Sequence, residues 1–439
     1  MLRDAKVELV VARAEKDPAV TAELIEYLGS EIRTVRFNAA LTLGELGEKA
    51  ADGVSGLIDC LEDDDWSICR EATKSLGKIG TAAVDAIPML SKLLKDDEAT
   101  IRKEAAISLG KIGVATDVAM SSLIETLRDK DEEIRTEVVN TLGKMGAGAH
   151  TAIPNLIECF KDPSWTVRNA AALAIDGIGK GSAEAIPALV KALEDPDWRV
   201  RHRSINTLSQ IGNSAIPALL DVVNHDNPIV RQGVAETLGE MKVTEPNVIQ
   251  AVASLLSDKD EKVRGKSADA LKNIGPEAIP AMVQSYDLVN NKMKTQILSA
   301  LGGIGQEAKS ALPHVIKTLK EGGTKIRVEA VRALGKIGLP DEPVILALRD
   351  ALVDNKKEVR REAALSLGKL GPGASDAIHS LLDTLNDKQP EVRWRASEAL
   401  GYIGVASNEV ISALEMRSHD EKDFVAEAAQ EALDLISGE

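Results

Sequence analysis

The chain has 439 residues, of which 53 are basic and 69 acidic, and it carries a net charge of −16. Aromatic residues make up only 2%, so a hydrophobic core must be built from Ala, Leu, Ile and Val instead of large rings. The acidic balance argues against nucleic acid as a partner, and the three cysteines, Cys60, Cys69 and Cys159, are too few and too scattered for a disulfide framework or a zinc site.

The first element in chain order is a capping helix, predicted over residues 1–18. Its sequence lacks the long apolar run of a signal peptide. No apolar stretch in the chain reaches the length of about 18 residues that a transmembrane helix needs. These features predict a cytoplasmic protein with no membrane contact.

Residues 19–404 repeat one unit of 30–33 residues twelve times, and residues 405–439 are predicted to form a C-terminal capping repeat. Each copy ends in a sequence motif close to Leu-Gly-Lys-Ile-Gly. Repetition at this period indicates a solenoid, in which each unit buries its apolar face against its neighbours. In chain order, the first residues of this motif in repeats 1–13 are Leu43, Leu76, Leu109, Leu142, Ile175, Leu208, Leu238, Leu271, Leu301, Leu334, Leu367, Leu400 and Leu433.

Each unit is predicted to contain two helices of about thirteen residues, or about 20 Å each. The first helix opens near an Ile-Pro pair, because proline is favoured in the first helical turn. The second helix is predicted to start at a Val-Arg pair and to end at a glycine in a left-handed C-cap. Trp66, Trp165 and Trp198 share one column in the turn between the two helices. We expect them to cover the edge of the core, and a binding row is the alternative.

An arginine recurs seven residues before the first residue of the motif in ten repeats. An aspartate recurs in the turn that precedes this arginine. Two interpretations are open. The arginines either form a basic ladder for an anionic ligand, or each pairs with a turn aspartate and ties one repeat to the next. Their joint recurrence favours the pairing. The arginines are Arg36, Arg102, Arg135, Arg168, Arg201, Arg231, Arg264, Arg327, Arg360 and Arg393.

The pattern D-x-x-x-x-V-R-x-x-A-A-x-x-L-G-x-I-G resembles HEAT repeats, specifically the short kind named after phycobilin lyases. The resemblance covers nearly the whole chain, whereas the T-P-L-H motif of ankyrin and the W-x-x-L-G-x-x-Y motif of tetratricopeptide repeats do not occur. It implies an all-α fold, an α-solenoid (a right-handed superhelix) of about thirteen two-helix HEAT-like repeats. In such families the second helices line a concave groove, and extended surfaces of this kind bind other macromolecules.

Two places in the predicted groove stand out. The first combines Trp394 and Tyr402 with Arg361 and Arg395 in repeats 11 and 12, a composition typical of interface hot spots. The alternative for Trp394 is a ring packed flat on neighbouring side chains. The second place is the divergent centre, for which ordinary sequence drift is the alternative to a partner contact. Its candidate binding residues are His202, Arg203 and Gln232, beside Asn206 and Gln210.

No catalytic motif is present. None of the six histidines is followed by glutamate, so the iron-binding pairs of deoxyhypusine hydroxylase, an enzyme built from similar repeats, are absent. We therefore predict a non-enzymatic scaffold with no catalytic residue, metal or cofactor, which acts as a monomer and binds a protein partner along its concave surface. The resemblance implies one alternative, a bilin lyase subunit or a chaperone-like maturation factor. A nucleic-acid-binding protein is the other alternative, and it would need a basic concave face.

Overall fold

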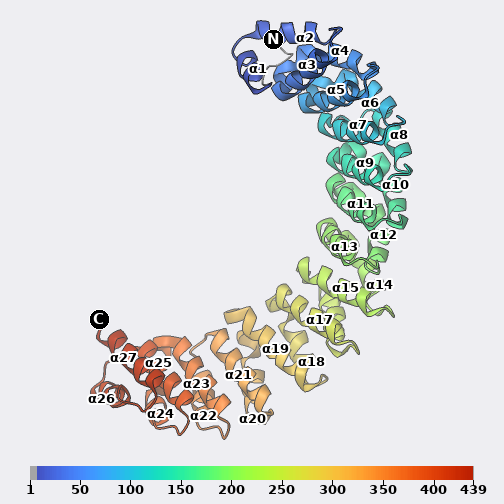
Figure 1. Ribbon diagram of the computed structural model, residues 1–439. Coiled ribbons are helices and arrows are strands. Elements are labelled where there is room, and N and C mark those ends of the chain that lie inside the picture. Colours follow the sequence, from blue (N-terminus) through green and yellow to red (C-terminus); the bar gives the residue numbers. More distant parts are fainter. Residues whose placement is uncertain (1–6, 439) are drawn as a thin grey trace. The chain divides into compact units, whose positions relative to one another are not determined.

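The computed structural model describes residues 7–438, without the side chains of residues 180 and 181. Every regular element in this range is a helix. The chain divides into an N-terminal unit, Met1–Leu219, and a C-terminal unit, Leu220–Glu439. The boundary falls within α14 (Ile216–Asp221). Each unit is described by itself, and the two are shown in Figure 1.

In the N-terminal unit, first and second helices form two adjoining layers (Figure 1). The layers follow α1 (Val7–Ala14), which packs against α3. It lies within the predicted capping helix, of which residues 1–6 are outside the described part. The first helices are α2 (Pro18–Tyr27), α4 (Val54–Asp59), α6 (Ile87–Leu93), α8 (Asp117–Thr126), α10 (Ile153–Glu158) and α12 (Ile186–Ala192). The second helices are α3 (Arg33–Leu46), α5 (Trp66–Ile79), α7 (Ala99–Ile112), α9 (Glu132–Lys144), α11 (Trp165–Ile178) and α13 (Trp198–Ile211).

The C-terminal unit has the same two layers. Its first helices after α14 are α16 (Pro246–Ser254), α18 (Ile279–Tyr286), α20 (Leu312–Glu321), α22 (Glu342–Ala351), α24 (Ile378–Thr384) and α26 (Asn408–Arg417). Its second helices are α15 (Pro228–Glu240), α17 (Glu261–Ile274), α19 (Asn291–Ile304), α21 (Thr324–Ile337), α23 (Lys357–Leu370), α25 (Pro390–Ile403) and α27 (Asp423–Ser437). The all-α solenoid of two-helix repeats is thereby confirmed.

The first helices are shorter than predicted, because a 3₁₀ turn replaces their beginning in most repeats. Eight such turns follow the terminal glycine or lie close to it: η1 (Gly47–Gly53), η3 (Gly80–Ala86), η4 (Gly146–Ala152), η6 (Lys180–Ala185), η7 (Gly212–Ala215), η9 (Pro276–Ala278), η10 (Gly305–Ala311) and η11 (Gly371–Ala377). Three more end first helices: η2 (Cys60–Glu62), η5 (Cys159–Lys161) and η8 (Leu255–Ser257). The Ile-Pro pairs stand at the start of the α-helical part, as predicted, for example in α6 and α12.

The terminal glycines have positive φ, but the predicted left-handed cap is correct for only some of them. Gly113, Gly338 and Gly404 are left-handed and lead into open loops. At Gly80 and six similar positions ψ is near −140° instead, for example φ 74° and ψ −139° at Gly80. This conformation suits glycine because it has no Cβ, and it turns the chain directly into the following 3₁₀ segment.

The second helices begin two residues before the predicted Val-Arg start. In α5, α9, α13 and α17 an aspartate side chain caps the helix by accepting a backbone N–H, as Asp65 does from Ser67. Trp66 and Trp198 consequently stand at the first helical position, where they are 53% and 63% exposed. The prediction that this column covers the edge of the core is therefore wrong for these two tryptophans.

Successive second helices approach closely along a seam of small residues. An added Cβ at any of nine glycines would lie within 3.1 Å of an atom 31 residues later in the next second helix. Serine or threonine at that later position often donates a hydrogen bond to a carbonyl of the previous second helix, as Ser108 does to Thr73 at 2.8 Å. The nine glycines are Gly44, Gly77, Gly110, Gly143, Gly239, Gly302, Gly335, Gly368 and Gly401.

Candidate protein-binding surface

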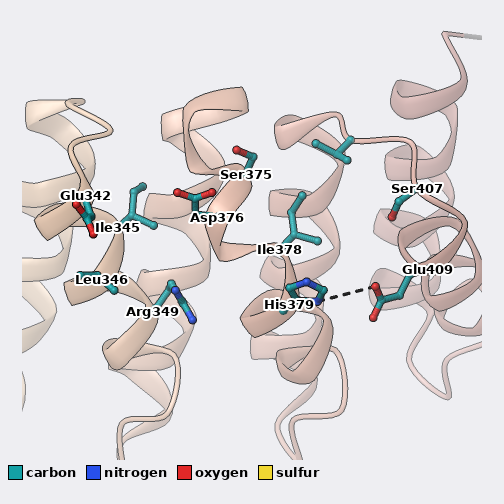
Figure 2. A pocket seen from close by; sticks show the side chains of 11 residues that line it. Glu342, Ile345, Leu346, Arg349, Ser375, Asp376, Ile378, His379, Ser407 and Glu409 are labelled. Atoms are coloured by element: carbon teal, nitrogen blue, oxygen red, sulfur yellow. Dashed lines mark ion pairs between the residues drawn. The ribbon is translucent and has the colours of Figure 1, made fainter.

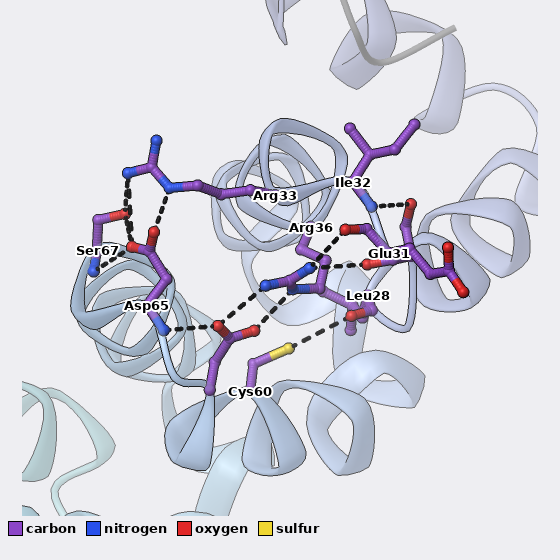
Figure 3. Close-up of polar contacts among 10 residues, drawn as sticks. Leu28, Glu31, Ile32, Arg33, Arg36, Cys60, Asp65 and Ser67 are labelled. Carbon is purple, nitrogen blue, oxygen red and sulfur yellow. Dashed lines mark hydrogen bonds and ion pairs between the residues drawn. The ribbon is translucent and has the colours of Figure 1, made fainter.

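Eight of the ten recurrent arginines form ion pairs with turn aspartates, which confirms the pairing interpretation for them, whereas Arg201 and Arg264 donate to backbone carbonyls of the preceding turn. In the first pair, Arg36 Nε donates to Asp63 Oδ2 at 2.7 Å and Nη1 donates to the Ser30 carbonyl at 2.9 Å. Figure 3 shows Arg36 with its polar contacts. Each paired arginine therefore holds the turn of its own repeat and the aspartate of the next. The eight pairs are Arg36–Asp63, Arg102–Asp129, Arg135–Asp162, Arg168–Asp195, Arg231–Asp258, Arg327–Asp354, Arg360–Asp387 and Arg393–Asp420.

The basic-ladder alternative is wrong for these eight arginines, because their guanidinium groups are engaged and largely buried. In the last pair the side chains of Arg393 and Asp420 are 9% and 1% exposed. The hydrogen bond from Arg393 lowers the pKa of Asp420, and the hydrogen bond from Arg36 lowers that of Asp63. These carboxylates stay ionised at neutral pH and serve the stacking of repeats, so a binding surface must be sought elsewhere.

We call the side chains that second helices leave exposed or half-buried the second-helix face. Trp394 lies on this face in α25 and is half-buried. Its ring meets Phe424 of α27 edge-to-face, with 5.8 Å between centroids, and the Arg395 guanidinium lies 3.7 Å from its ring centroid. Arg395 also pairs with Glu398 at 2.6 Å. Trp394 is thus packed on neighbouring side chains while one part of it stays accessible.

Tyr402 and Arg361 are the more exposed members of the predicted group. Tyr402 is 56% exposed, and its ring lies over Gly368 of α23, where an added Cβ would be 3.4 Å from Cδ2. Arg361 is exposed on α23 and has no carboxylate within 4.0 Å among the described residues. The structure therefore places the four predicted residues on two adjacent second helices. It brings Trp394 and Arg395 into contact, and Tyr402 packs separately.

The predicted central residues belong to different units. His202 is exposed and Arg203 half-buried on α13 of the N-terminal unit, whereas Gln232 is half-buried on α15 of the C-terminal unit. Each lies on the second-helix face of its own unit. Their joint role as one contact area stays a prediction.

Phe424 was missed by the sequence reasoning, although a spacing rule would have found it. Contacts between adjacent second helices recur 30 residues apart, as in Lys103–Glu133 and Arg332–Glu362. Phe424 stands 30 residues after Trp394. A search for aromatic pairs at this spacing would have predicted their contact.

The first-helix layer of the C-terminal unit has a groove of its own, shown in Figure 2. Its volume is about 550 Å³, and its lining comes from α22, α24, α26 and the segments that precede α24 and α26. His379 Nδ1 lies 3.8 Å from Glu409 Oε2 across it. None of the residues predicted as binding residues lines this groove.

Between residues 7 and 438, no three His, Cys, Asp or Glu side chains are placed to hold a metal ion together. No helix of the range has the length and apolar character needed to cross a membrane.

The family model that describes HEAT repeats matches residues 7–77, 54–120, 116–176, 153–239, 216–302 and 345–434. A second model, of the PBS lyase HEAT-like repeat, matches residues 326–354. No curated protein matches the sequence. Together the first set of matches extends over most of the chain.

Among solved structures, the chain is similar to the karyopherin Kap121p. In its complex with Ste12p the TM-score is 0.62 at 13% identity, with 98% of this chain and 55% of that chain covered. In its complex with the extreme C-terminus of the protein phosphatase Cdc14p the TM-score is 0.57 at 13% identity, with 98% and 52% covered. The chain thus spans about half the length of these relatives, and at this identity the likeness concerns the fold.

Proposed function

Because the chain belongs to the HEAT-repeat family, we propose that it is a non-enzymatic scaffold that binds a protein partner on its second-helix face. The contact area is the part of the C-terminal unit that contains Arg361, Trp394, Arg395 and Tyr402. The observation that carries this proposal is Tyr402, an aromatic side chain that is 56% exposed, on the helix next to the one that carries the unpaired Arg361. Exposed aromatic and arginine side chains are the residues on which protein interfaces depend most.

The family and its structural neighbours support the proposal at the level of architecture. In two of the similar solved structures, Kap121p is bound to Ste12p and to Nup53p. A solenoid leaves one side of each helix layer without an intramolecular partner, and repeat proteins use such extended surfaces for binding. We place the partner on the second-helix face, in the concave groove that the resemblance implies, with the protein acting as a monomer in the cytoplasm.

The alternatives have less support. The PBS lyase HEAT-like match covers only residues 326–354 and describes the repeat, so a bilin lyase subunit or maturation factor stays a prediction. Binding of nucleic acid is disfavoured by the net charge of −16.

Affinity capture from the native source tests the proposal. The wild-type chain should retain one or a few proteins, identified by mass spectrometry. The Arg361→Ala/Tyr402→Ala variant should lose them, whereas Lys78→Ala, which removes a cation from the second-helix face of the N-terminal unit, should retain them. Retention by every variant would place the contact elsewhere, and an empty wild-type capture would refute a stable protein partner.

A further inference from the structure

Several exposed cations on the second-helix face of the C-terminal unit lack any carboxylate within 4.0 Å among the described residues. Three of them, Lys336 of α21 and Arg361 and Lys369 of α23, lie in repeats 10 and 11 close to the predicted contact area, and others are Lys262, Lys272 and Lys325. Other cations of the same helices do have partners. Arg332 pairs with Glu329 at 2.6 Å and with Glu362 at 3.1 Å. The unpaired charges therefore remain although carboxylates stand on the same helices.

The corresponding part of the N-terminal unit satisfies most of its cations internally. Lys78 pairs with Glu45 at 2.6 Å, Lys103 with Glu133 at 2.7 Å and Lys144 with Glu137 at 3.5 Å, and Lys74 lies 3.6 Å from Glu71. Arg70 and Lys111 are exceptions, and a half-buried unpaired carboxylate, Glu104, shares their face. In repeats 10–12 no unpaired carboxylate stands at the repeat positions of Lys336, Arg361 and Lys369, although the exposed Glu358 lies one turn before Arg361 on α23.

Two aromatic side chains on α25 stand at the repeat positions that these cations occupy on the preceding second helices. Tyr402 covers Gly368, the residue next to Lys369, and Trp394 occupies on α25 the position that Arg361 occupies on α23. Lys336 and Lys369 are likewise at equal positions on adjacent second helices, which pack about 10 Å apart. Three residues of an extended chain span about the same distance. A peptide that crosses these helices in an extended conformation could therefore place one acidic side chain on each.

We propose that the docking segment of the partner is an extended acidic peptide, an inference that rests on the proposed function. It carries carboxylates at about every third residue and at least one aromatic or apolar side chain. The carboxylates pair with Lys336 and Lys369, and the apolar side chain packs against Tyr402. Arg361, about 12 Å from Lys369 along α23, adds positive charge to the same face. The charges favour this ligand over nucleic acid, since three cations on a chain of net charge −16 neutralise few of the closely spaced phosphates of a polynucleotide.

The test uses the full chain and a fluorescein-labelled peptide of about ten residues with glutamate at every third position and one phenylalanine, a length that spans three second helices. Binding is measured by fluorescence polarisation at low and high salt. The Lys336→Gln/Arg361→Gln/Lys369→Gln variant should bind it about tenfold more weakly, equivalent to about 1.4 kcal/mol. The matched variant Lys78→Gln/Lys103→Gln/Lys144→Gln should stay within about twofold of wild type. Circular dichroism confirms that both variants fold.

Three results would overturn this inference: equal weakening by both variants, equal affinity for a peptide with glutamine in place of glutamate, or tighter binding of a single-stranded DNA oligonucleotide of similar length. Any of these leaves the proposed function standing if the capture experiment still depends on Arg361 and Tyr402. Loss of that dependence, with intact binding of the acidic peptide, would refute the proposed partner contact instead.

Discussion

The second-helix faces of the two units are built from the same columns of residues, but they satisfy their charges differently. In repeats 2–4 lysines such as Lys78 and Lys144 reach carboxylates of the same chain. In repeats 10 and 11 Lys336, Arg361 and Lys369 do not, and Trp394 and Tyr402 take the equivalent positions in repeat 12. A repeated scaffold thus keeps its stacking residues constant while neighbouring surface columns specialise.

The largest test of this comparison concerns the Arg–Asp pairs, which occur in both units. Arg102→Ala and Arg360→Ala should each destabilise their repeats by about 3–5 kcal/mol, because each leaves a largely buried aspartate without its arginine partner. Hydrogen exchange should locate both effects at the altered repeats and their neighbours. Arg361→Ala, one residue after such an arginine, is the control and should change stability by less than about 0.5 kcal/mol. If only one unit responds, the units differ in more than their surfaces.

The glycine seam gives an intermediate effect. Gly77→Ala and Gly335→Ala should each cost about 1–3 kcal/mol, because the new Cβ would lie 2.9 and 3.0 Å from the Cα atoms of Ser108 and Ser366. Gly265→Ala in α17 meets nothing within 4 Å and should stabilise its helix by about 1 kcal/mol. Urea unfolding checks all three. Equal changes in the free energy of unfolding for Gly265→Ala and Gly335→Ala would contradict the close approach of second helices at the seam glycines.

The smallest effect is a difference in acid sensitivity. Burial lowers the pKa of His314 in the C-terminal unit, where Lys317 and Lys294 act in the same direction and Asp287 opposes them. Its Nε2 is buried without a hydrogen-bond partner, and its ring lies 4.7 Å from that of Tyr286.

Since the unfolded chain takes up the proton first, stability of this unit should fall as the pH drops below about 6.5. His314→Phe should flatten this dependence, as measured by hydrogen exchange in α18 and α20 between pH 7 and 5. An unchanged slope in the variant would assign the effect to another group.

Much of the fold could be predicted from the sequence, because stacking imposes the same residue types at every repeat. The recurrent arginines, aspartates and glycines predicted two-helix units and the pairing of Arg36 with an aspartate such as Asp63. The 3₁₀ turns were missed, since the sequence shows that a terminal glycine has positive φ without showing ψ. The exposure of Trp66 and Trp198 was also mispredicted, because a helix start placed only two residues too late moved them into the turn.

The candidate site was less predictable, because its contacts form between different repeats. The residue types alone predicted Arg361, Trp394 and Tyr402 as candidates, but ion pairing depends on which side chains meet across adjacent helices. Residues 30 and 33 apart meet in this stack, as Lys103 and Glu133 or Lys78 and Glu45 do. Whether a cation has a partner therefore depends on the residue that the neighbouring repeat places 30 or 33 positions away.

The junction between α17 and α19 in the C-terminal unit lacks both features that join repeats elsewhere, the Arg–Asp ion pair and the seam glycine. Arg264 donates to the carbonyls of Asp258 and Lys259, and the position of its aspartate partner is taken by Leu288, which is 77% exposed. Lys272 stands where the seam glycine would be, and α17 packs less extensively on α19 than on α15. Under bending or pulling, this joint should yield before those that have both the ion pair and the glycine. The unit would then respond to force as two stiff segments joined at a compliant point between α17 and α19.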